Sequence, residues 1–349
     1  MIAVLVTGPV VTGETPTPEP AFADVLAVGG TSEDAPRPRR PGVAAPEGPL
    51  PTVGVAPYVD LTTPPLPALT DMADATGQAD VVLAFVLAGE DGACAPTWGG
   101  TTPMTDPAVG QRIAALKARG GTMTVSSGGA IGDYLEAACP DAPSLARAYG
   151  AALDVVGTDH LDVDVETDRG REVSVRRIAE ALALLQRERG TRVTLTVQID
   201  GVDEGLSADA QELVRQTTTA GVAARVNLMV MNYSYDGGTW ADAMTGAART
   251  AVRQLEGVWP GSESADVRRR TGVTFMLGRN DMDMTTTPAD ARAVVDDARA
   301  AGYGGVGFWA VARDNGSCPG TADEADDCSG IAQAPWEFTR IARGFTAPA

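Results

Sequence analysis

The sequence predicts an α/β protein, a (β/α)8 TIM barrel formed by a single domain. Short runs rich in β-formers alternate with helical patterns, and such alternation produces right-handed βαβ units and a parallel sheet. Eight such runs are present, the number that closes this barrel, and about 295 residues is a suitable length. The alternative is an open doubly wound sheet, but no glycine-rich turn follows the first run. The predicted strands are Thr52–Asp60, Val81–Leu87, Thr122–Ser126, His160–Glu166, Arg192–Gln198, Arg225–Asn232, Gly272–Leu277 and Gly304–Ala310.

Local signals mark the ends of several helices between these strands. Asp106 and Thr287 each precede a proline, which predicts an N-cap followed by proline at the first helical position. Ser207 is a third predicted N-cap. Gly120 and Gly302 follow helical patterns and predict where those helices stop.

The domain is expected to span residues 52–349, with residues 1–51 outside it. The stretch Ala35–Pro51 is rich in proline, which predicts an extended linker. The N-terminal residues are too few and too polar for an independent binding module. Ile2–Val11 is apolar and Ala21–Ala23 resembles a signal-peptidase site, although a Gly-Pro pair interrupts the run and no basic residue precedes it. We expect a secreted, extracellular protein whose signal segment is incomplete.

The composition excludes several classes of function. The 349 residues include 27 Lys and Arg against 46 Asp and Glu, a formal net charge of −19. So acidic a chain is repelled by phosphate, so nucleic acid and membrane are not expected partners. No apolar run approaches the roughly 20 residues that span a bilayer. The single histidine disfavours His-rich metal sites and Ser-His-Asp catalysis.

The cysteines bear on the compartment. Cys94, Cys139, Cys318 and Cys328 form no C-x-x-C pair that would indicate zinc. An even number of well-spaced cysteines indicates two disulfides and an oxidising compartment. Four unrelated reduced thiols are the alternative.

The fourth predicted strand carries three acids at alternate positions. Asp162, Asp164 and Glu166 share one face, and the apolar residues that alternate with them share the other. In a barrel the acids would point inward and climb towards the carboxyl ends of the strands, where barrel enzymes keep their active sites. Neighbouring acids would lie about 6.6 Å apart, so at least one pKa should rise, as suits a general acid.

Two other interpretations of this strand are weaker. A solvent-exposed acidic edge does not agree with the apolar residues that alternate with the acids. A calcium loop of the D-x-D-x-D-G type would need glycine at position 167, where the chain has Thr167, and a later glutamate that is missing. We therefore favour catalysis.

These residues resemble glycoside hydrolase family 18, the chitinases and their relatives. Asp159 to Glu166 is similar to the family's D-x-x-D-x-D-x-E signature. Ser126–Gly129 resembles its S-x-G-G motif, Met231–Tyr233 its M-x-Y motif, and Trp309 stands where the family keeps a tryptophan beneath the sugar. Segments resembling a bacterial chitinase branch are Pro57–Asp60, Cys94…Trp98–Gly100 and Met276…Asn280–Asp281.

The chain departs from the family pattern at three positions. His160 replaces the usual glycine, and we expect it to pack rather than to catalyse. Asn232 and Ser234 flank the motif tyrosine where family members carry an acid on one side or the other. An amide still donates and accepts hydrogen bonds, so this departure is compatible with activity, although the charge of the acid is lost.

The resemblance implies a substrate-assisted, retaining mechanism without metal or organic cofactor. Glu166 would protonate the glycosidic oxygen, and the substrate's 2-acetamido oxygen would attack the anomeric carbon. Asp164 would orient the acetamido group, Asp162 would share its proton, and Tyr233 would bind the acetamido oxygen. Trp98 and Trp240 would extend the groove or pack in loops. The expected substrate-binding residues are Trp309, Asn232, Met231, Ser126, Gln198, Trp98 and Tyr58.

Three functions agree with these residues: a chitinase, an endo-β-N-acetylglucosaminidase of N-glycans, and a sugar-binding protein with weakened turnover. The Cys94…Trp98 loop favours the chitinase. Gly278–Thr287 leaves no room for the domain that exo-acting relatives insert, which indicates an open groove and endo cleavage. We expect a monomer. The expected disulfides are Cys94–Cys139, whose loops follow adjacent strands on one barrel face, and Cys318–Cys328, which would close a short loop after the eighth strand.

Overall fold

The computed structural model describes residues 54–62, 66, 69–166, 173–321 and 325–346. All of them belong to one compact unit of the chain, Arg40–Ala349. The expected signal-like segment and linker, residues 1–51, lie outside the described residues. The domain boundary at residue 52 therefore stays a prediction.

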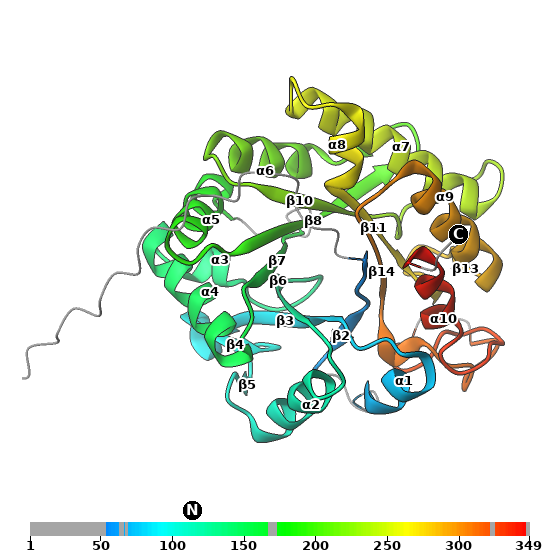
Figure 1. The fold of residues 1–349 in the computed structure, drawn as a ribbon, viewed down its shortest axis with the longest axis horizontal. Helices are drawn as coiled ribbons and strands as arrows, with labels where there is room; N and C mark the ends of the chain where they lie inside the picture. The colour runs from blue at the N-terminus through cyan, green and yellow to red at the C-terminus, as the bar shows by residue number, and fades with distance from the viewer. Residues whose placement is uncertain (1–53, 63–65, 67–68, 167–172, 322–324, 347–349) are drawn as a thin grey trace, which may run out of the picture. The chain divides into compact units, whose positions relative to one another are not determined.

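Parallel strands form a closed barrel, as predicted (Figure 1). The first predicted strand is split at Ala56-Pro57: β1 (Gly54–Val55) pairs with β14, and β2 (Tyr58–Asp60) pairs with β3, so the two halves together close the ring. Proline has no N–H to donate, and the Pro57 carbonyl still accepts from Val82 at 2.9 Å. From β2 the order continues through β3 (Val81–Gly89), β6 (Met123–Gly128), β7 (His160–Asp164), β8 (Arg192–Gly201), β10 (Ala224–Met229), β11 (Thr271–Met276) and β14 (Gly305–Trp309).

Helices surround this ring (Figure 1). The predicted caps are confirmed, because Asp106 accepts from two backbone N–H groups, Ser207 accepts from one, and Thr287 forms a capping box with Asp290. No helix in the described ranges is long and apolar enough to cross a bilayer. The helices are α1 (Leu69–Thr76), α2 (Pro107–Lys117), α3 (Leu135–Ala138), α4 (Ala142–Val156), α5 (Val175–Arg189), α6 (Ala208–Thr219), α7 (Trp240–Val258), α8 (Ser264–Arg269), α9 (Pro288–Ala301) and α10 (Glu337–Arg343).

Short strands outside the barrel were not predicted. Beyond β3 the chain turns back into antiparallel β4 (Ala93–Trp98) and β5 (Thr102–Pro103). After β11, the hairpin of β12 (Gly278–Arg279) and β13 (Thr285–Thr286) fills the segment before α9. The remaining short elements are β9 (Gly205–Leu206) and the 3-10 turns η1 (Glu90–Gly92), η3 (Val311–Arg313) and η4 (Gly344–Thr346).

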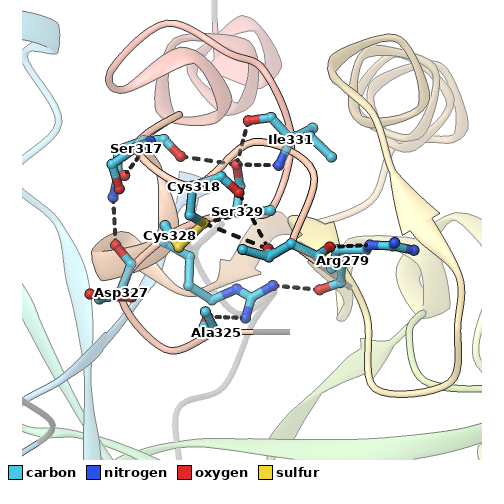
Figure 2. The surroundings of a disulfide bond; sticks show 12 residues. Arg279, Ser317, Cys318, Ala325, Asp327, Cys328, Ser329 and Ile331 are labelled. Carbon is cyan, nitrogen blue, oxygen red and sulfur yellow. Dashed lines mark hydrogen bonds between the residues drawn. A yellow bond between two sulfur atoms is a disulfide. The ribbon is translucent and has the colours of Figure 1, made fainter. Parts of the chain in front are cut away.

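Both expected disulfides are present. Cys94 of β4 bonds Cys139, the residue after α3, and Cys318 bonds Cys328 in the loop that follows β14. Figure 2 shows the second bond with Arg279 of β12 beside it. The Arg279 N–H donates to the Ser329 carbonyl at 2.8 Å, so this loop is joined to the hairpin after β11.

The inside of the barrel differs from the layer between strands and helices. That layer is a continuous apolar core, to which β7 contributes Leu161 and Val163. The opposite face of the strands holds only a small separate apolar cluster of Ala56, Tyr58, Val82 and Ala84, with Phe85 and Trp309 against it. Barrel interiors are usually filled by branched apolar side chains. Here much of the interior is polar, and that part forms the site.

Candidate functional site

The three acids face the inside of the barrel, as the alternation predicted. Asp162, Asp164 and Glu166 are 1%, 4% and 7% exposed. Asp162 is in register with Ser126 of β6, and Asp164 with Gly128, the last residue of that strand. β7 ends at Asp164 instead of Glu166, so Glu166 lies just beyond the strand, at the carboxyl end of the barrel.

Asp162 is held by three hydroxyl groups. Ser126 Oγ and Tyr58 Oη donate to its Oδ2 at 2.7 and 3.0 Å, and Thr196 Oγ1 donates to its Oδ1 at 2.7 Å. Burial raises the pKa of Asp162 to about 6, although the hydrogen bonds from Ser126, Thr196 and Tyr58 each lower it. One acid of this strand thus has a raised pKa, as expected, but the cause is burial and not the repulsion between neighbouring acids on which the expectation rested.

The polar layer continues across the barrel. Asn227 Nδ2 of β10 donates to Thr196 Oγ1 at 3.1 Å and to Thr274 Oγ1 of β11 at 3.0 Å. Tyr58 and Ser126 belong to this layer, are 2% and 0% exposed and hydrogen-bond Asp162, so the structure shows them supporting that acid, and their expected contact with the substrate stays a prediction. Sequence reasoning missed Asn227 and Thr274, although polar residues at inward positions of predicted strands are a usable signal.

The glycines of the S-x-G-G motif allow close contact with β7. A Cβ on Gly128 would lie 2.0 Å from the Asp164 carbonyl oxygen, and the Gly129 N–H donates to that oxygen at 2.7 Å. Tyr134, which is buried and was not predicted, accepts from the Glu166 N–H at 3.2 Å and donates to the Gly129 carbonyl at 2.5 Å. Its hydroxyl therefore joins the backbone of Glu166 to this motif.

Three aromatic rings form a cluster at the end of β14, and one of them, Tyr58, hydrogen-bonds Asp162. Trp309 is half-buried and stacks on Phe85 of β3, with ring centroids 5.4 Å apart and planes inclined by 16°. The Tyr58 ring is 6.1 Å from Trp309. Trp309 thus occupies the predicted place, and Phe85, which had no motif to mark it, supports its ring.

The M-x-Y segment follows β10. Tyr233 is buried and packs on Trp240, with ring centroids 4.9 Å apart. Burial raises the pKa of its hydroxyl. That hydroxyl is buried and has no hydrogen-bond partner within the described parts of the chain. Asn232 has a φ of 58° and donates to Asp281 Oδ2 at 2.8 Å, so its amide fixes the loop after β12. Met231 is buried beside them.

Two other expected substrate contacts fall in different places. Trp98, the last residue of β4, is 0% exposed and belongs to the apolar core, so the structure supports packing, the alternative to its expected role in the groove. Trp240 is buried as well and donates from Nε1 to Thr286 Oγ1 at 3.0 Å. Gln198 is half-buried on β8, two residues beyond Thr196 and hence on the same inward face.

His160 packs at the amino-terminal end of the barrel, as expected. It is buried between Thr124 Oγ1, 3.0 Å from Nδ1, and Thr194 Oγ1, 2.9 Å from Nε2. Burial, with help from Arg192 and Arg225, lowers its pKa to about 3. The ring is therefore neutral under ordinary conditions.

The side chains of this site offer proton transfer. Within the described ranges, no group of three His, Cys, Asp or Glu side chains could hold a metal ion. Buried acids at the carboxyl end of a barrel, next to a half-buried aromatic ring, can protonate a leaving group, balance positive charge and support an apolar face of a ligand. The fold and site define a (β/α)8 domain with a carboxylate centre.

Comparisons with known proteins narrow this class. No protein-family model matches the chain. It is 30% identical over 322 residues to a probable bifunctional chitinase/lysozyme of Escherichia coli, covering 87% of this chain and 36% of that protein. It is 28% identical over 288 residues to Endochitinase 11 of Metarhizium anisopliae, covering 78% of this chain and 54% of that one. The chain thus spans about a third to a half of these relatives.

A solved structure covers nearly the whole domain. The catalytic domain of a hyperthermophilic chitinase from Pyrococcus furiosus superposes with a TM-score of 0.77 at 27% identity, over 85% of this chain and 96% of that one. The chain belongs to glycoside hydrolase family 18. The predicted (β/α)8 fold and the family resemblance are both confirmed.

Proposed function

We propose that this domain hydrolyses internal β-1,4 bonds of chitin and chito-oligosaccharides with retention of configuration, using the 2-acetamido group of the substrate as the nucleophile. The observation that carries the proposal is the inward row Asp162, Asp164 and Glu166, which ends at the carboxyl mouth of the barrel near Trp309. The related Pyrococcus furiosus domain was solved in complex with chito-oligosaccharides, which supports this substrate class.

Each acid would have one task. Glu166 would donate a proton to the glycosidic oxygen, since it lies farthest towards the mouth. Asp164 would orient the acetamido N–H and balance the positive charge of the cyclic intermediate. Asp162, with its pKa raised to about 6, would hold a proton beneath Asp164 and share it as the charge changes.

Two aromatic residues would hold the reacting sugar. The Tyr233 hydroxyl, which has no partner among the described residues, would donate to the acetamido oxygen. Trp309 would support the apolar face of the ring, with Phe85 stacked against it. Met231 and Gln198 border the same mouth as secondary contacts.

The mode of action follows from the loops. The segment between β11 and α9 holds only the β12–β13 hairpin, and this supports an open groove and endo cleavage. We further propose that the protein is secreted, because the two disulfides suit an oxidising compartment. That it is a monomer stays a prediction.

Product analysis tests this proposal. The purified protein is incubated with chitin hexamer and, in parallel, with a high-mannose glycopeptide, and Glu166→Gln prepared identically controls for host enzymes. We expect internal cleavage of the hexamer into products that keep the β-anomer at early times. Release from chain ends alone would contradict endo action. Cleavage of the glycopeptide alone would mean that the protein is an endo-β-N-acetylglucosaminidase. Binding of chitin without cleavage would mean that it is a sugar-binding protein.

A further inference from the structure

Arg225 is a buried cation inside the barrel, at the end opposite to Glu166. It is the second residue of β10 and is 7% exposed. Its Nη2 is buried, and its guanidinium has no hydrogen bond or ion pair with any described residue. Gly304 leaves room for it, since a Cβ there would lie 2.8 Å from Arg225 Nη1. An uncompensated buried charge is among the most destabilising features a fold can contain.

The charges that act on Arg225 are also positive and add to the cost of burying it. Burial lowers its pKa to about 10, and Arg192 and Arg270, at the amino ends of the adjacent strands β8 and β11, add repulsion. Arg192 is already paired with Asp159 at 2.7 Å, and Arg270 donates to the Ala224 carbonyl at 3.0 Å. This end of the barrel therefore contains excess positive charge, in a chain whose net charge is −19.

A second donor faces the same space. A cavity of about 40 Å³ is lined by Arg225, His160, Thr124 and Thr194. A neutral imidazole has one N–H, so one ring nitrogen of His160 donates to one threonine and the other nitrogen accepts from the other threonine. The threonine that accepts keeps its own hydroxyl proton for a further acceptor. In either tautomer, one threonine O–H on the cavity wall is left available to donate.

The acid on this cavity does not neutralise Arg225. Asp162 also lines it, but no ion pair or hydrogen bond joins the two side chains in the described part of the chain, and the hydroxyls of Ser126, Tyr58 and Thr196 bind both carboxylate oxygens. A volume of 40 Å³ holds roughly one to three water-sized bodies, which is too small for a sugar or for most polyatomic anions.

We propose that a small monovalent anion of the size of chloride binds in this cavity, between the guanidinium of Arg225 and the free hydroxyl of Thr124 or Thr194. The anion compensates the buried charge and stabilises the folded barrel. Arg225 lies at the end of the strands opposite to Glu166, and Asp162 borders the cavity from the side of the proposed catalytic acids. The anion would bind whether or not the domain hydrolyses chitin, because its proposed partners Arg225, Thr124 and Thr194 have no task in that reaction.

Thermal unfolding at fixed ionic strength tests the site. Sodium gluconate, whose anion is too large for the cavity, is replaced stepwise by sodium chloride or bromide. We expect the Tm of the unchanged protein to rise by several degrees and to saturate, as for a ligand that binds only the folded state. Arg225→Met should remove this dependence and, because it deletes an unpaired buried charge, melt no lower than the unchanged protein in gluconate. Arg187→Met, an exposed arginine on α5, should keep the full dependence.

A direct readout needs no variant. Crystals of the full chain soaked in sodium bromide should show an anomalous peak within hydrogen-bond distance of Arg225 Nη2. No peak in this cavity, or the same halide dependence of Tm in Arg225→Met as in the unchanged protein, would overturn the proposal.

Discussion

Tyr58 donates its hydroxyl hydrogen to Asp162 across the barrel, with 3.0 Å between Oη and Oδ2, although 104 positions separate the two residues in the chain. Both side chains are buried, and burial raises the pKa of each, to about 6 for Asp162. The site therefore contains an acid that can hold a proton near neutral pH directly beneath Asp164. This store of a proton is what a mechanism with changing charge at Asp164 requires.

Asp162→Asn should change the pH dependence of stability. Because the folded pKa, about 6, exceeds the ordinary value of 3.8, the folded state binds more protons between these values, and stability falls as pH rises through this window. The penalty is roughly 3 kcal/mol above pH 6, at about 1.4 kcal/mol per pKa unit. Asn cannot ionise, so the variant should gain stability relative to the unchanged protein from pH 4 to pH 7. Urea unfolding at both pH values measures the difference, and a constant difference would contradict the assignment.

Glu166→Gln should retain the fold and sugar binding but lower kcat by at least about 100-fold, the lower range for loss of a general acid. The two side chains are nearly the same size, so Tm should hardly move. Initial rates on chitin oligomers, with binding measured by titration calorimetry, provide the check. A variant that keeps more than half of the activity would remove Glu166 from the mechanism.

Tyr134→Phe should impair catalysis only by disturbing the position of Glu166. The change removes the hydroxyl that joins the Gly129 carbonyl to the Glu166 N–H. We expect a loss of about 1–3 kcal/mol of stability, and the side chain of Glu166 should be held less firmly in position. Tyr149→Phe is the matched control, since its buried hydroxyl binds Glu136 at 2.6 Å and does not touch the backbone of Glu166. We expect similar losses of Tm in both variants and a lower kcat only in Tyr134→Phe. Equal kcat values would show that Tyr134 is merely structural.

The two disulfides should differ in their contribution to stability. Their sequence separations are 45 and 10 residues, for which loop-closure entropy gives about 4 and about 3 kcal/mol. Two double variants are compared, each with both cysteines of one disulfide replaced by serine. The variant without Cys94–Cys139 should lose more free energy of unfolding than the variant without Cys318–Cys328. Denaturant unfolding of the two double variants measures this order, and the reverse order would show that strain or residual structure outweighs loop length.

Local signals in the sequence were sufficient for most of the fold. Strand alternation and the caps at Asp106, Ser207 and Thr287 depend on residues close in the chain, and the structure confirms them. The inward row of acids follows from the period of a strand alone. The β4–β5 excursion was missed, because its pairing with β3 depends on a turn and a register that periodicity does not encode.

Side-chain partners across the barrel were harder to predict. Tyr134 and Phe85 act through contacts with residues distant in the chain, and neither belongs to a motif. Trp98 could be read as a sugar platform or as a buried anchor, and only tertiary packing, which buries it completely, favours the second. Tyr58 and Ser126 were found by resemblance, but their function as hydrogen-bond donors to Asp162 required coordinates.

The most direct test of the mechanism compares hydrolysis of a chitin hexamer with hydrolysis of the fully deacetylated chitosan hexamer. The linkage and ring are the same in both, and only the acetamido group differs. If that group is the nucleophile, the protein should cleave the acetylated hexamer and leave the deacetylated one at the background rate of Glu166→Gln. Cleavage of the deacetylated hexamer within tenfold of the chitin rate would contradict the account, because a carboxylate of the protein would then have to form the intermediate.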